Sequence, residues 1–93
     1  MKVLYPIEWD AKDYFEQAAK GWLSGVIVQQ TDGKEHVLTF YDPARLAQEI
    51  ESELGEGKSG FIEQGLIVIP EVTKENIEKA IQQAKNEGYF QGL

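Results

Sequence analysis

Few side chains in this sequence are of the types that carry out chemistry. His36 is the one histidine, and the chain has no cysteine. Neither a zinc site nor a Cys-His pair can be built, because each needs further histidine or cysteine residues. The serines Ser24, Ser52 and Ser59 lie in no Gly-x-Ser-x-Gly elbow, and nothing places one beside His36. We therefore expect no catalytic residue, no metal site and no cofactor, and we expect His36 to be solvated near a hairpin tip.

Two further patterns contain the residue types of a site without its spacing. Gly57-Lys58-Ser59 is similar to the end of a phosphate-binding loop, but such a loop has glycine five positions earlier, where this chain has Ser52. It also follows an expected helix and opens an expected strand, which is the reverse of the P-loop order. The acidic side chains Glu49, Glu51 and Glu53 show no Asp-x-Asp or EF-hand spacing. These patterns predict a flexible connector and a solvated helix face.

The charge and length exclude several classes of protein. The 93 residues include 16 acidic and 9 basic side chains, and the formal net charge is −7. This charge repels phosphate, so we expect no nucleic-acid partner. With 42% hydrophobic residues, the length suits a single domain over residues 1–93 with one modest core. The first residues lack a signal-peptide pattern, and no apolar run approaches the roughly 20 residues of a membrane helix. We expect a soluble, cytoplasmic protein.

Hydrophobic periodicity and capping residues predict a strand, a helix and a strand in the first third of the chain. Residues 2–9 alternate as a strand, although Pro6 favours a strand end or a sheet edge. Asp10 is the predicted N-cap of a helix that ends at Gly21. The next strand is predicted over residues 22–30.

The dipeptide Asp32-Gly33 is the sharpest local signal. Between two apolar-rich segments it predicts a hairpin with a two-residue type I′ turn, in which Gly33 has positive φ. Such a turn would place Val28 opposite Val37 and would fix the pairing of the two strands.

This register divides the apolar residues of the hairpin between two faces. One face carries Leu23, Gly25, Ile27, Leu38 and Phe40. The other face carries the candidate interface residues Trp22, Val26, Val28, Val37 and Tyr41. Large exposed apolar patches mark interaction sites, which favours an interface. The alternative is that the C-terminal helix or the tail at residues 89–93 covers this face within the domain.

The second half of the chain predicts a helix, a strand and a last helix. Asp42-Pro43 is typical of a helix start, with a cap followed by proline at the first helical position. Residues 61–69 are predicted as a strand, and the run from Leu66 to Ile69 is apolar on both faces, which indicates a central strand. Thr73 caps the last helix, which Gly88 ends.

The resulting order is β-α-β-β-α-β-α, which predicts an α+β domain with a single-layer four-stranded sheet and three helices. Its first six elements match the ferredoxin-like (split βαβ) order. Pro6 conflicts with that topology, in which the first strand is central, so another α+β sandwich is the alternative. Acylphosphatases and ACT-type domains have a similar order, but the arginine and the glycine that they carry after the first strand are absent from residues 6–10.

These observations favour a small protein–protein interaction or regulatory module without catalytic activity, which binds a protein partner or a second copy of itself. The alternative is a small-ligand-binding, ACT-like regulatory domain with a pocket between sheet and helices. An enzyme would need an acid-only or backbone-only site that the sequence does not indicate.

Overall fold

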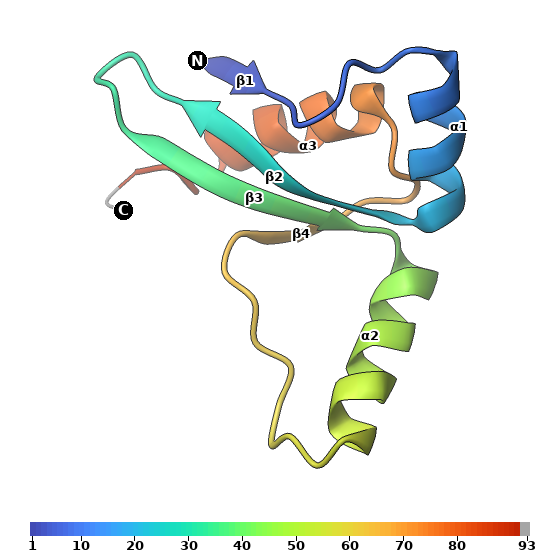
Figure 1. Ribbon diagram of the computed structural model, residues 1–93. Coiled ribbons are helices and arrows are strands. Elements are labelled where there is room, and N and C mark those ends of the chain that lie inside the picture. The colour runs from blue at the N-terminus through green and yellow to red at the C-terminus, as the bar shows by residue number, and fades with distance from the viewer. Residues whose placement is uncertain (92–93) are drawn as a thin grey trace.

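A computed structural model describes residues 1–91 and shows four strands and three helices (Figure 1). In chain order they are β1 (Lys2–Leu4), α1 (Ala11–Lys20), β2 (Trp22–Gln29), β3 (Glu35–Tyr41), α2 (Pro43–Gly55), β4 (Leu66–Val68) and α3 (Lys74–Asn86). This is the predicted element order. Within residues 1–91 no helix has the length and apolar character to cross a bilayer. Residues 92 and 93, part of the tail expected to help cover the sheet, lie outside the described residues.

Each helix begins where the sequence predicts. The side chains of Asp10, Asp42 and Thr73 accept hydrogen bonds from the backbone N–H group three residues on, at 2.8, 2.7 and 3.2 Å. These bonds satisfy N–H groups that the first turn of a helix cannot pair internally. The first helix ends at Gly21, as expected, with Gly21 in the left-handed conformation.

The strand order corrects the predicted ferredoxin-like topology. The sheet is mixed, with the order β1-β2-β3-β4, so β1 lies at an edge rather than in the centre. The pairs β1–β2 and β2–β3 are antiparallel, and β3–β4 is parallel. The edge position agrees with Pro6, because proline removes a donor that a central strand would need. The strand ends at Leu4, before the proline.

The hairpin between β2 and β3 has positive φ at Gly33, as predicted, but its loop is one residue longer. Gln30 N–H donates to the Lys34 carbonyl at 2.8 Å, which leaves residues 31–33 as a three-residue loop. Gly33 has φ +89°, and no other residue of this loop has positive φ. Because the loop is odd in length, Ile27 rather than Val28 lies opposite Val37. The predicted type I′ turn and its register are therefore wrong.

A β-bulge reverses the predicted faces of β2. The pairing with β3 shifts between Leu23 and Val26, so Ser24 and Gly25 together interrupt the alternation. Beyond this point Val26 and Val28, rather than Ile27, share the face of Leu23. Val26 and Val28 have no exposed surface, which excludes them from the surface patch in which the sequence placed them.

The core lies between one face of the sheet and α3. It contains apolar residues of β2, β3 and α3, together with Trp9 of the β1–α1 loop and Phe90 beyond α3. On α3 the buried residues are Ile77 and Ile81. The second helix is arranged differently, because it extends away from the end of β3 (Figure 1). The face of the sheet opposite α3 is more exposed at Val37, which has 60% of its surface accessible, whereas Thr39 and Tyr41 on the same side of β3 are buried.

The last strand is shorter and less covered than predicted. It spans Leu66–Val68, not residues 61–69, and it forms the edge of the sheet next to β3. Its residues are apolar on both faces, but Val68 is 46% exposed. The predicted central strand is therefore an edge strand, and residues 61–65 form part of the long loop that returns from α2.

Candidate functional site

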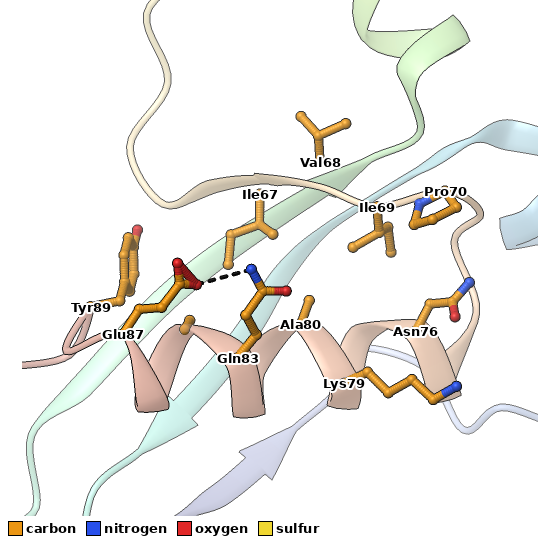
Figure 2. A pocket seen from close by; sticks show the side chains of 11 residues that line it. Ile67, Val68, Ile69, Pro70, Asn76, Lys79, Ala80, Gln83, Glu87 and Tyr89 are labelled. Atoms are coloured by element: carbon orange, nitrogen blue, oxygen red, sulfur yellow. Dashed lines mark hydrogen bonds between the residues drawn. The ribbon is translucent and has the colours of Figure 1, made fainter.

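A groove of about 480 Å³ lies between β4 and α3. Figure 2 shows Ile67 and Ile69 pointing from the strand segment toward the helix, whereas Val68 points away from it. Ala80 lies on the opposite wall, and Ala84 of the same helix also lines the groove. Two alanines, each a single methyl group, leave space that larger residues would fill. The groove therefore exists because α3 carries alanine where it passes the edge of the sheet.

Polar side chains of α3 form the outer rim of this groove. Asn76, Lys79, Gln83 and Glu87 line it on successive turns. Gln83 Nε2 donates to Glu87 Oε2 at 2.9 Å, and Asn76 Nδ2 donates to the carbonyl of Glu71 at 3.0 Å. Lys79 has no ion pair among residues 1–91. The rim thus presents a positive charge on one turn and a negative charge two turns further on.

The backbone of β4 is the second component of the site. Thr39 N–H donates to the Gly65 carbonyl at 2.9 Å, and Ile69 N–H donates to the Tyr41 carbonyl at 2.9 Å. Successive residues of a strand direct their backbone groups to opposite sides. Gly65 and Ile69 point toward β3, so the backbone groups of Leu66 and Val68 point outward, at the free edge of the sheet. No charged residue or proline protects Leu66–Val68 itself, although such residues commonly block exposed edges.

A second groove continues the site along β3. Because β4 pairs with Thr39–Tyr41 alone, the part of β3 before Thr39 has no strand on this side in the described chain. The opening there has about 460 Å³ and is lined by His36, Val37, Leu38, Gln64, Gly65 and Tyr89. Tyr89 lines both grooves, which makes it the side chain that joins them.

Gly65 lies directly before β4, where the chain comes very close to the backbone of β3. A Cβ atom at this position would collide with the backbone carbonyl oxygen of Val37. Its φ is +69°, which also disfavours any other residue. Glycine is therefore needed for β4 to approach β3 and to place its free edge above α3.

His36 lies near the hairpin, as predicted, but it is half-buried rather than solvated. Its Nε2 lies 3.3 Å from Gln30 Oε1, and its ring is 5.0 Å from the ring of Phe90. Among residues 1–91, no three histidine, cysteine or acidic side chains gather as metal ligands. The lining of the two grooves combines apolar and amide side chains with the charged Lys79 and Glu87 and with His36 and Tyr89.

The structure separates the five predicted interface residues. Val26 and Val28 lie in the core under α3, so assigning them to an outer face was wrong. The internal-packing alternative describes these two correctly. Val37 lies on the opposite, exposed face. Trp22 is half-buried beneath two cations, Lys20 Nζ at 4.4 Å and the Arg45 guanidinium at 5.9 Å from its ring.

Tyr41, the fifth of these residues, is buried at the corner between β3 and α2. Its hydroxyl donates to Glu63 Oε2 at 3.0 Å, and its ring packs edge-on against Phe61 at 6.4 Å. Burial, followed by the hydrogen bond to Glu63, raises the pKa of Tyr41 to about 12. Tyr41 thus joins the start of α2 to the loop that returns to β4.

A separate cluster of aromatic and acidic side chains joins the first residues to α3. Tyr5 donates to Glu78 at 3.2 Å and Tyr14 donates to Glu75 at 2.9 Å. Both tyrosine rings pack on Trp9, at 5.6 and 5.1 Å. Because the rings fill the space between the first residues and α3, the role of this cluster is structural.

Sequence reasoning missed the residues of the groove. Ala80 and Ala84 have the spacing of an ordinary inward helix face, and Tyr89 resembles the usual apolar contact after a helix-ending glycine. The detectable signal was the short apolar run before Pro70, since a central strand is seldom so short. The chain matches no protein-family model, no curated protein and no solved structure at a significant level.

Proposed function

We propose that this chain is a protein–protein interaction module that binds an extended segment of its partner as an added strand along β4. The observation that carries the proposal is the free edge of β4 beside an apolar groove whose opposite wall is α3. Strand addition takes its affinity from main-chain hydrogen bonds and its specificity from pockets for alternate side chains. The outward backbone groups of Leu66 and Val68 supply the first, and the groove supplies the second.

The shape of the groove defines the chemistry of the bound segment. Alternate side chains of an added strand would point toward α3, against Ile67, Ala80 and Ala84. These should be apolar and of moderate size. Lys79 favours an acidic residue at one end of the segment, and Glu87 favours a basic residue at the other. The two charges would therefore also select the direction of the segment.

A small-molecule ligand is a second candidate for the same groove. Its volume of about 480 Å³ falls within the roughly 300–1,000 Å³ of small-molecule sites. An apolar floor with Asn76, Lys79 and Gln83 at the rim suits a molecule with an apolar body and a carboxylate. A thermal-shift screen of such acids tests this candidate, since a ligand at 100 times its Kd adds about 2.7 kcal/mol of stability.

The experiment for strand addition is selection from a displayed library of random 12-residue peptides, followed by binding measurements with the selected peptides. We expect alternating apolar residues in the selected sequences. Val68→Pro removes the outward N–H group, whereas its control Val68→Ala shortens the side chain and keeps that donor. We expect the first variant to weaken binding at least tenfold, a loss of about 1.4 kcal/mol. Val68→Ala should weaken it much less.

A second pair of variants tests the groove itself. Ala84→Phe places a ring in the groove, and Ala19→Phe adds the same ring on the exposed side of α1. Binding should be lost in the first and kept in the second. Hydrogen exchange should show slower exchange of the Leu66 and Val68 amides when peptide is bound. Peptides that bind equally well to Val68→Pro and Ala84→Phe would refute strand addition at β4.

A further inference from the structure

The face of the sheet opposite α3 has an apolar part that is incompletely covered. We call it the open face and define it by Ile27, Val37, Leu66 and Val68. Val37 is 60% exposed and Val68 is 46% exposed, and Ile27 and Leu66 are half-buried. Thr39 and Tyr41 also lie on this side of β3 but are buried, so the open face does not extend to the end of β3 where α2 begins. Figure 1 shows α3 along one side of the sheet and α2 leading away from its end. An apolar part of a sheet face that is incompletely covered favours a further layer.

The second helix, in turn, lacks a sheet face on which to pack. It lies between the parallel strands β3 and β4, and the helix of such a crossover normally packs on a face of the sheet. Its apolar stripe is Leu46, Ile50 and Leu54, yet none of its thirteen residues, all in the described part of the chain, is buried. Leu54 is 48% exposed, and Ile62 in the returning loop is 90% exposed. One chain thus presents a sheet face without its helix and a helix without its sheet face.

Contacts at the base of α2 hold the helix away from its own open face. Asp42 N–H donates to the Gly21 carbonyl at 2.8 Å, and the Arg45 guanidinium lies over the ring of Trp22. A bond from the Tyr41 hydroxyl to Glu63 anchors the returning loop at the same corner. Closing α2 onto its own sheet would break these contacts together.

We propose that the open face is the binding site for α2 of a second copy of this chain. In a twofold-symmetric dimer each α2 would lie on the sheet of the other copy, so the same two surfaces are used twice. A 13-residue helix is about 20 Å long and about 10 Å wide. Two such helix-on-sheet contacts, with both surfaces counted, bury about 800 Å², which is the size of a weak, transient interface rather than of a permanent one.

Salt should distinguish this partner from a basic protein. Each copy has a net charge of −7, so two copies repel one another, and added salt should strengthen the dimer by screening that repulsion. A basic partner bound to the acidic surface would be released by salt instead.

The test is sedimentation velocity and light scattering of the full chain over a range of concentrations. Val37→Glu alters the open face, Leu54→Lys alters α2, and each should raise the dimer Kd at least tenfold. Phe15→Lys is the control, because Phe15 is 77% exposed on α1 and should leave association unchanged. An equimolar mixture of the two defective variants should associate again, since one contact then pairs two unaltered surfaces. A merely misfolded variant would show no such rescue.

Three results would overturn the proposal. The first is a wild-type chain that stays monomeric up to about 1 mM, the weak end of measurable association. The second is association that survives both substitutions, which would place the contact elsewhere, with loss in Val68→Pro pointing to the edge of β4. The third is a monomer in which α2 has closed onto its own sheet, seen as proximity between spin labels at Leu54 and Val37 within one chain.

Discussion

The helices α2 and α3 have the same length and the same kind of sequence but opposite surroundings. Each has 13 residues, an N-terminal side-chain cap and an apolar stripe. The third helix buries Ile77 and Ile81 against the sheet, whereas within α2 no described residue is buried. An apolar stripe therefore shows that a helix needs a partner surface, but it does not show whether that surface belongs to the same chain.

The two faces of the sheet teach the same lesson. The face under α3 is closed by Val26, Val28, Leu38 and Phe40, which are almost completely inaccessible. On the open face Val37 remains accessible, although Thr39 and Tyr41 further along the same side of β3 are buried. Isolated helices of this length are marginal in water, so α2, in which no described residue is buried, should add little to the stability of the monomer. Stability should therefore be concentrated on the α3 side of the molecule.

The largest expected difference comes from placing a charge on each face of the sheet. Val28→Lys buries an unpaired ammonium in the core and should cost about 4 kcal/mol or more, a large share of the stability of a small domain. Val37→Lys places the same charge on the open face and should change the free energy of unfolding by about 0.5 kcal/mol or less. Urea unfolding at the lowest workable protein concentration measures both. Equal losses would show that the open face is covered within the monomer.

A smaller difference is expected when one side chain is shortened in each helix. Ile81→Ala removes buried methyl groups from α3 and should cost about 3 kcal/mol, because the core around it cannot collapse completely. Ile50→Ala in α2 should cost about 1 kcal/mol or less in the monomer. Urea midpoints with unchanged m-values provide the measurement. A loss from Ile50→Ala as large as that from Ile81→Ala would contradict the unpacked state of α2.

Two glycines with positive φ distinguish backbone strain from close approach. At Gly33 an added Cβ meets nothing within 4 Å, so Gly33→Ala should cost about 1 kcal/mol through strain alone. At Gly65 the same atom would also collide with the Val37 carbonyl, so Gly65→Ala should cost about 2 kcal/mol or more and should disturb the edge of β4. Thermal unfolding compares the two variants. Equal costs would show that β4 does not approach β3 as closely as described.

Local features of the fold were predictable from the sequence, because short-range chemistry determines them. The caps Asp10, Asp42 and Thr73 act through side-chain bonds three residues away, and positive φ at Gly33 follows from turn geometry. The strand register failed because one additional loop residue shifts every pairing. The bulge at Ser24 and Gly25 then changed which valines point inward. Patterns with a period of two are sensitive to such single-residue shifts.

Features that depend on distant elements were not predictable in the same way. The position of β4 at the edge depends on where the chain returns to the sheet after α2. The apolar run from Leu66 to Ile69 is the same for a central and for an edge position, so it does not distinguish the two. The groove needs Ala80 and Ala84 to pass beside that edge, and a sequence gives no sign of this until the sheet order is known. Pro6 was the one residue whose chemistry argued correctly against a central first strand.

The smallest expected effect tests the corner where α2 leaves the sheet. Burial and the bond to Glu63 raise the pKa of Tyr41 from 10.0 to about 12. Because the folded-state pKa lies above the unfolded one, this group contributes stability that is complete below pH 10 and lost as the pH rises through 12. The difference in phenolate absorbance between the wild type and Tyr41→Phe isolates this titration, and Glu63→Gln should move it to lower pH. A midpoint near 10 in the wild type would mean that water reaches the corner, and that α2 is freer to move than its contacts with Gly21 and Trp22 imply.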